Sequence, residues 1–159
     1  MNAASKPEAV GRPMEILFVE DSLTAARLTT GVLRKAAFGH RLTWLRDGRE
    51  ALQFLKREAK YKHAPRPDLI LLDLGLPYVD GQEVLRTVRS TAELNEIPVV
   101  IMTGSEDEQR KLKGESLEVA AYLLKPVDYA KLMQILDDLC IFWRKDMVVA
   151  GEGSRRRSI

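Results

Sequence analysis

The sequence predicts an α/β fold, in which a five-stranded parallel sheet carries helices on both faces. Five short apolar runs favour it, because each is too short for a helix and has little polar alternation, which is typical of strands buried on both faces. The runs are Ile16–Val19, Leu42–Leu45, Leu69–Leu72, Val99–Met102 and Tyr122–Leu124. Amphipathic stretches alternate with these runs, and parallel strands need such crossover helices.

Five helices are expected between and after the runs, because apolar residues recur there at helical spacing. These positions are Leu28, Val32, Leu33 and Ala36, then Ala51, Leu52 and Leu55, then Val84, Leu85 and Val88, and finally Leu132, Ile135, Leu136, Leu139, Phe142 and Trp143. The last set gives the clearest helix. The stretch from Glu106 to Leu117 gives the weakest, because Leu112 is nearly alone there among charged residues.

Length and composition indicate one domain with short tails. The chain has 159 residues, of which 45% are apolar and 30% charged, the balance of a globular protein that can bury a core. Residues 1–13 lack apolar periodicity, and the C-terminus ends in Gly-Glu-Gly-Ser and three arginines. We therefore predict a flexible segment over 1–13, a domain over 14–143 and a basic flexible tail over 144–159.

The charge distribution excludes several classes of partner. The net charge is +2, and the segment from Arg144 onward holds five basic and two acidic residues, which leaves −1 for residues 1–143. Such a body offers no basic surface for nucleic acid or membrane. The single cysteine, Cys140, excludes an internal disulfide, and no run approaches the roughly 20 apolar residues needed to cross a bilayer. Without the pattern of a signal peptide at the N-terminus, we expect a cytoplasmic protein.

Polar residues follow the predicted strands. Ligands of an open parallel sheet bind beyond the carboxyl ends of its strands, so these positions are informative. Glu20 and Asp21 follow the first run, Asp73 the third, Thr103 the fourth and Lys125 the fifth. If the strands are neighbours, three carboxylates, a hydroxyl and an ammonium meet at one edge of the sheet.

This set of side chains favours phosphoryl chemistry on a carboxylate. Three neighbouring carboxylates need a counter-charge, and an open site with oxygen ligands suits Mg²⁺ better than Ca²⁺. A carboxylate beside such an ion can attack a phosphoryl group and form an acyl phosphate. Asp73, at the central strand, is the best-placed nucleophile. Glu20 and Asp21 would hold the metal. Lys125 and Thr103 would contact the remaining phosphoryl oxygens.

These motifs, in this order and at these separations, resemble the response regulator receiver domain of two-component signalling. They are the pair Glu20-Asp21, Asp73 within Leu71–Pro77, Asp80-Gly81, Pro98–Thr103 and Tyr122–Pro126. The resemblance covers residues 14 to about 143. It implies a flavodoxin-like sheet with strand order 2-1-3-4-5 and five helices.

The resemblance also implies roles for individual residues. Asp73 would accept a phosphoryl group from a sensor histidine kinase. Mg²⁺ would lie on Glu20, Asp21, Asp73 and the backbone carbonyl of Gly75. The protein would not be an enzyme beyond Mg²⁺-dependent self-phosphorylation and the loss of its own phosphoryl group.

A conformational switch is implied as well. Thr103 and Tyr122 would reorient, and the fourth and fifth helices would pass the signal on by protein contact or onward phosphotransfer. Taken by itself, Tyr122 is most simply a strand aromatic that packs on its neighbours, and the switch is what the family resemblance favours. The peptide bond between Lys125 and Pro126 could be cis or trans, and a cis bond would re-aim the lysine.

Within the family the chain is most similar to stand-alone regulators paired with bacterial phytochrome kinases. The features that carry this similarity are Ala26-Arg27-Leu28-Thr29, Tyr61 with Ala64-Pro65-Arg66-Pro67-Asp68, and Phe142-Trp143. Phe142 and Trp143 could finish the core, or they could be an exposed aromatic contact of a homodimer. The resemblance favours the dimer.

Three positions depart from the family pattern or lie where the family sets its kinetics. Glu118 stands where the family commonly has a glycine that ends the fourth helix, so we expect this helix to end differently. Gly75 and Ser105 stand where the family controls the access of hydrolytic water. Because Gly75 has no side chain, we expect a short-lived acyl phosphate.

Two other functions deserve comparison. A phosphatase that works through an aspartyl phosphate would use Asp73 as nucleophile, but it needs an acid two residues further on, where this chain has Gly75. A receiver-like module that binds partners without phosphorylation is the other alternative, and the complete set of acceptor residues argues against it.

Overall fold

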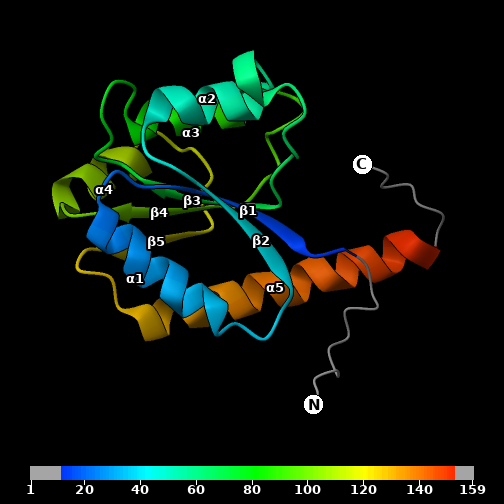
Figure 1. Ribbon diagram of the computed structural model, residues 1–159. Coiled ribbons are helices and arrows are strands. Elements are labelled where there is room, and N and C mark those ends of the chain that lie inside the picture. The colour runs from blue at the N-terminus through cyan, green and yellow to red at the C-terminus, as the bar shows by residue number, and fades with distance from the viewer. Residues whose placement is uncertain (1–11, 153–159) are drawn as a thin grey trace.

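The computed structural model describes the backbone of residues 12–152 and the side chains of residues 12–141. It contains a parallel sheet in the order β2-β1-β3-β4-β5, which confirms the predicted fold class and strand order (Figure 1). The strands are β1 (Met14–Val19), β2 (His40–Leu45), β3 (Leu69–Asp73), β4 (Val99–Thr103) and β5 (Ala121–Leu124). The helices are α1 (Leu23–Arg34), α2 (Gly48–Lys56), the 3-10 turn η3 (Ala59–Tyr61), α3 (Gly81–Ser90), α4 (Glu106–Lys113) and α5 (Tyr129–Glu152).

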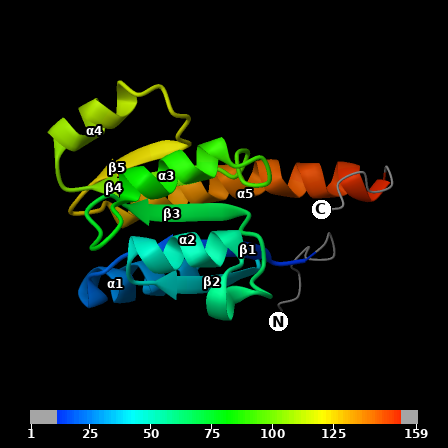
Figure 2. The ribbon, with the colours of Figure 1, turned by 90° about the horizontal axis from the view of Figure 1, so that it is seen from above.

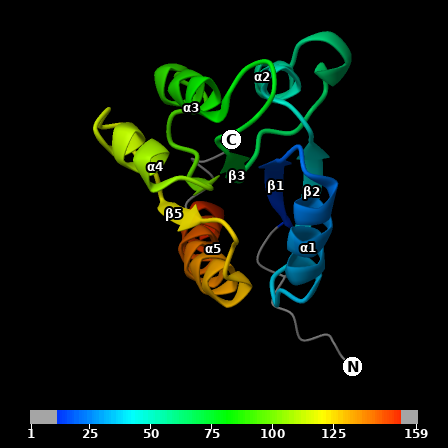
Figure 3. The same ribbon diagram turned by 90° about the vertical axis from the view of Figure 1, so that its left-hand side faces the viewer.

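The central strands are apolar at every position because both of their faces are covered. In β1, Ile16 and Phe18 belong to the core shared with α1 and α5, whereas Leu17 and Val19 belong to the core shared with α2 and α3. Figure 3 shows the two helical layers on either side of the sheet. The alternation follows from the two-residue period of a strand, which sends neighbouring side chains to opposite faces.

The expectation that all five strands are buried on both faces is wrong for the two edge strands. Most of β2 is only half-buried, and in β5 the buried residue is Leu123, whereas Leu124 is exposed. An edge strand has a neighbour on one side only, so its helical cover is incomplete. Trp44 in β2 is among the half-buried residues.

Helix α4 is held weakly, as its sequence predicts. It has eight residues, and Leu112 is its buried residue. Ser105 caps the N-terminus, where its hydroxyl accepts hydrogen bonds from the backbone N–H groups of Asp107 and Glu108. Because Leu112 is the buried apolar residue of α4, this helix has far less apolar contact with the core than α3, which buries Val84, Leu85 and Val88.

The connection from α4 to β5 has Glu118 where the family commonly has a glycine, and other contacts stabilise it. The left-handed residue of this turn is Ser116, with a φ of 60°, and not residue 118. The Glu118 carbonyl accepts a hydrogen bond of 2.8 Å from Arg89 of α3, and Glu115 pairs with Arg86 at 2.9 Å. The expected difference in how this helix ends is therefore present, and two arginines of α3 hold the connection.

Helix α5 begins where Asp128 accepts hydrogen bonds from the backbone N–H groups of Ala130 and Lys131. It reaches Glu152 and extends beyond the end of the sheet (Figure 2). The boundary at residue 143 stays a prediction, and the side chains of Phe142 and Trp143 lie outside those that the structure describes. Among the described helices, none combines the length and apolarity that a bilayer crossing requires.

Candidate functional site

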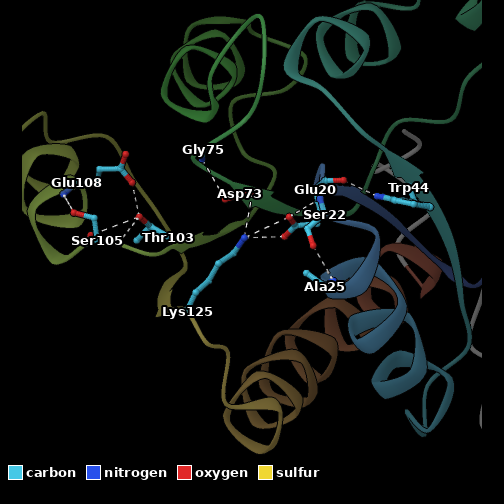
Figure 4. A network of polar contacts seen from close by, with 10 residues as sticks. All are labelled: Glu20, Ser22, Ala25, Trp44, Asp73, Gly75, Thr103, Ser105, Glu108 and Lys125. Atoms are coloured by element: carbon cyan, nitrogen blue, oxygen red, sulfur yellow. Dashed lines mark hydrogen bonds and ion pairs between the residues drawn. The ribbon is translucent and has the colours of Figure 1, made fainter.

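The carboxyl ends of the strands meet as the sequence predicts. Glu20 follows β1, and Asp73 is the last residue of β3, the strand that pairs with both β1 and β4. Both carboxylates are buried, with 1% and 4% of their surface exposed, whereas Asp21 is exposed. Lys125 follows β5 and reaches across the edge of the sheet toward them (Figure 4).

Lys125 connects the two buried carboxylates. Its Nζ lies 3.1 Å from Oε1 of Glu20 and 3.2 Å from Oδ2 of Asp73. The peptide bond to Pro126 is cis, which answers the question that the sequence leaves open. The ammonium group therefore supplies part of the counter-charge that this edge requires.

The close approach of these charged groups shifts the pKa values of Glu20 and Lys125. Burial raises the pKa of Glu20 above its ordinary value, and the nearby charge of Asp73 raises it further, although Ser22 and Lys125 oppose the shift. Burial alone would lower the pKa of Lys125. The carboxylates of Asp73 and Glu20 outweigh burial and raise it, so Lys125 stays an ammonium. The site thus favours the binding of a further cation.

Backbone contacts fix the orientation of Asp73. The Gly75 N–H donates to its Oδ1 at 3.1 Å. Gly81, at the start of α3, packs so closely that an added Cβ would lie 2.4 Å from the Asp73 carbonyl oxygen. Asp80 caps α3 through a 3.0 Å hydrogen bond from the Glu83 N–H. The Asp80-Gly81 pair therefore has a structural reason: it brings α3 directly against the end of β3.

The three carboxylates fit a divalent metal ion. Glu20, Asp21 and Asp73 each offer an oxygen, and these oxygens lie within 4.8 Å of one another. Their formal charge of −3 exceeds the single positive charge of Lys125. Hard oxygen donors with one exposed member, Asp21, suit an ion that keeps some of its water. The arrangement supports a divalent cation.

Thr103 lies at the end of β4, the strand beside Asp73, but its hydroxyl is engaged elsewhere. It donates to Oε1 of Glu108 at 2.6 Å and accepts a hydrogen bond of 3.2 Å from the Ser105 N–H. Figure 4 shows these hydrogen bonds on the side of Thr103 away from Asp73. In this arrangement the hydroxyl does not point at the carboxylate cluster.

Tyr122 is a half-buried residue of β5, opposite Ile101 of β4. Burial raises the pKa of its phenol, and the Nζ of Lys113 lies 5.0 Å from the ring. This position agrees with the packing interpretation of Tyr122. The proposed role of the Gly75 carbonyl toward a metal and the reorientation of Tyr122 stay predictions.

Two residues that the sequence did not single out contact the site. The indole N–H of Trp44 donates to the Glu20 carbonyl at 2.8 Å, and Glu108 accepts from Thr103. Trp44 could have been found, because it lies near the end of the strand that pairs with β1. The contact of Glu108 with Thr103 depends on side-chain conformation, which a sequence pattern does not predict.

A buried aspartate beside a lysine and two further acidic groups, at the carboxyl edge of such a sheet, is the arrangement expected of a phosphoryl-accepting signalling domain. Comparison with known families agrees: residues 16–137 match the response regulator receiver domain. The chain belongs to this family, and its role is that of a phosphoacceptor in two-component signalling.

Relatives at moderate identity cover most of the chain. The response regulator Rcp1 of Synechocystis sp. is 40% identical over 131 residues, which are 82% of this chain and 89% of Rcp1. The bacteriophytochrome response regulator RtBRR is 38% identical, with a TM-score of 0.74 over 80% of this chain and 78% of that one. The phosphorylated cyanobacterial phytochrome response regulator RcpA is 38% identical, with a TM-score of 0.71 over 83% and 94% of the two chains.

Proposed function

We propose that Asp73 is the phosphoacceptor of this receiver domain and that the phosphoryl group comes from a sensor histidine kinase. One observation carries the proposal: a buried Asp73 carboxylate lies 3.2 Å from the Lys125 ammonium and within 4.8 Å of Glu20 and Asp21. A carboxylate oxygen of Asp73 would attack phosphorus while the bond from phosphorus to the histidine nitrogen breaks. The imidazole leaves with the electron pair of that bond and takes up a proton.

Each neighbour of Asp73 would have a separate task. The Lys125 ammonium would neutralise a phosphoryl oxygen, and the Thr103 hydroxyl would bind another after it turns away from Glu108. The Gly75 N–H already orients the carboxylate. Reorientation of Thr103 and Tyr122 would then carry the change toward α4, β5 and α5.

We propose that the metal is Mg²⁺, held by Glu20, Asp21, Asp73 and the Gly75 carbonyl. The relative Rcp1 has a structure in its Mn²⁺-bound form, which supports a divalent ion in this position. When bound, the ion supplies positive charge that draws the phosphoryl oxygens into place.

The direct test is phosphorylation in solution. The protein is incubated with Mg²⁺ and acetyl phosphate, and its intact mass is measured with time. A gain of one phosphoryl group that Asp73→Asn abolishes supports the proposal, and Asp80→Asn, an exposed capping aspartate, is the matched control that keeps the gain. No gain, either with acetyl phosphate or with an active cognate kinase, would contradict the proposal.

The names of the relatives support a phytochrome-type kinase as the phosphodonor, because RtBRR and RcpA are described as phytochrome response regulators. We place this exchange in the cytoplasm. Co-purification with such a kinase and transfer of its phosphoryl group to the parent, but not to Asp73→Asn, is the expected result. Labelling of both proteins alike would contradict Asp73 as the acceptor.

A homodimer through α5 is a further proposal. The helix continues past the sheet, and Ile141, the last residue with a described side chain, is 54% exposed. Phe142 and Trp143 follow directly. Solution mass is expected to fall from dimer to monomer in Trp143→Ala, and a monomeric parent would end this idea.

A further inference from the structure

The hydroxyl of Thr103 lies in a chain of hydrogen bonds that leads into α4. The Ser105 N–H donates to Thr103 Oγ1 at 3.2 Å, and Thr103 Oγ1 donates to Oε1 of Glu108 at 2.6 Å. Glu108 is itself an exposed residue of the first turn of α4. A short bond to a carboxylate is the stronger kind of hydrogen bond, so this contact holds the hydroxyl in one orientation.

The contact with Glu108 excludes a contact with a phosphoryl group. A hydroxyl has a single proton to donate. A phosphoryl oxygen on Asp73 and the Glu108 carboxylate would both need that proton, and Asp73 and Glu108 lie on different sides of Thr103 (Figure 4). The Thr103 hydroxyl can therefore donate to only one of these two acceptors at a time. Thr103 has two discrete orientations, one toward Glu108 and one toward a phosphoryl group on Asp73.

The sequence around Ser105 offers an alternative arrangement once Thr103 turns away. Ser105 is the N-cap of α4, and Glu108 is three residues further on, which is the spacing of a capping box. In a capping box the glutamate accepts a hydrogen bond from the N–H of the capping residue. Here Thr103 stands between the two groups, because it accepts from the Ser105 N–H and donates to Glu108. If Thr103 leaves, that N–H and the Glu108 carboxylate can pair directly.

We propose that Glu108 is a positioning residue that holds Thr103 in the resting orientation and links phosphorylation of Asp73 to the first turn of α4. This inference rests on the proposed function. In the resting state the bond to Glu108 lowers the fraction of molecules whose hydroxyl is available, and it therefore weakens the binding of a phosphoryl group or its mimic. In the phosphorylated state Glu108 caps α4 directly.

The test uses beryllofluoride, a mimic of the phosphoryl group, in the presence of Mg²⁺. Its dissociation constant is measured for the parent, Glu108→Ala and Glu106→Ala. The two variants each remove one negative charge from the same turn of α4, but Glu106 lines a surface groove with Gln109 and Leu124. We expect Glu108→Ala to bind beryllofluoride about three- to tenfold more tightly, because the loss of the short bond to the buried Thr103 hydroxyl outweighs the loss of the exposed capping bond in the bound state. Glu106→Ala should bind like the parent.

A double-mutant cycle shows whether the effect passes through the hydroxyl. In a Thr103→Val background, which removes the hydroxyl and keeps the shape of the side chain, Glu108→Ala should no longer change the dissociation constant. Equal binding by the parent and Glu108→Ala, or an equal gain in the Thr103→Val background, would overturn the role of Glu108. A parent that does not bind beryllofluoride, or binds it as Asp73→Asn does, would instead overturn the proposed function itself.

The amide of Ser105 gives an independent measurement. When beryllofluoride is added to the parent, the hydrogen-bond acceptor of the Ser105 N–H should change from Thr103 to Glu108. The amide should therefore stay protected from hydrogen exchange. In Glu108→Ala the same addition should leave this N–H without an acceptor, and its exchange should become faster. Unchanged exchange in Glu108→Ala would contradict the capping arrangement.

Discussion

The Nζ of Lys125 lies 3.2 Å from Oδ2 of Asp73, although the two residues are 52 positions apart in the sequence. The same ammonium also contacts Glu20. One cation therefore contacts two buried carboxylates that belong to two different strand ends, and it offsets part of their charge. This arrangement gives the lysine opposite effects on metal binding and on phosphoryl binding, since it repels the metal and attracts the phosphoryl group.

Lys125→Gln should separate these effects. Without the ammonium, Glu20 and Asp73 repel each other more strongly, so added Mg²⁺ should raise the melting temperature of Lys125→Gln more than that of the parent. Phosphorylation by acetyl phosphate should become slower by at least about tenfold, because a group that stabilises the transferred oxygens is missing. Lys131→Gln, at an exposed position of α5, is the control. A smaller Mg²⁺ effect in Lys125→Gln than in the parent would contradict this account.

Trp44 should report on and support the metal site. Its indole N–H holds the Glu20 carbonyl at 2.8 Å, so the loss of this hydrogen bond in Trp44→Phe should weaken Mg²⁺ binding by about fivefold, the equivalent of about 1 kcal/mol. In Trp143→Phe, where Trp44 is the remaining tryptophan of the two, fluorescence should change as Mg²⁺ is added. The Mg²⁺ affinity of Trp44→Phe is measured from the rise in its melting temperature as Mg²⁺ is added. An affinity equal to that of the parent would show that the contact does not support the site.

Much of the fold followed from the sequence because a doubly covered strand leaves a solid apolar run. The run Leu69–Leu72 is completely buried, and its unbroken apolar sequence is what predicts the strand. The edge strands were less predictable, since burial in β2 and β5 depends on their place in the sheet and not on their composition. The left-handed turn at Ser116 and the contact of Arg89 with Glu118 were not predictable at all, because they depend on how segments far apart in the sequence are joined.

The site was predictable where it depends on topology and unpredictable where it depends on side-chain conformation. Glu20, Asp73 and Lys125 come together because parallel strands end at the same edge. The partner of Thr103 was missed, since a rotation about one bond decides whether its hydroxyl faces Asp73 or Glu108. Resting and phosphorylated states share one sequence, and the pattern of residues is compatible with both orientations.

Arg89 should stabilise the fold by holding the connection between α4 and β5. It donates to the carbonyls of Glu118, Asn95 and Ile97, and burial lowers the pKa of its guanidinium. Arg89→Ala leaves these carbonyls without that donor and should lower the free energy of unfolding by about 1–2 kcal/mol in urea denaturation. Arg86→Ala removes an exposed pair with Glu115 and should have a smaller effect. Equal losses in the two variants would show that the backbone contacts of Arg89 are unimportant.

Gly75 should determine how long the phosphoryl group persists. An added Cβ at this position would have Asp73 Oδ1 as its nearest neighbour, at 4.0 Å, and the exposed backbone there can accept a side chain. In Gly75→Met the side chain should therefore cover the approach of water to the acyl phosphate, and loss of the phosphoryl group should become about threefold slower or more. The decay is followed by intact mass after acetyl phosphate is removed, with Gly39→Met, an exposed position just before β2, as the control. Decay of Gly75→Met at the rate of the parent would mean that water reaches the phosphoryl group by another route.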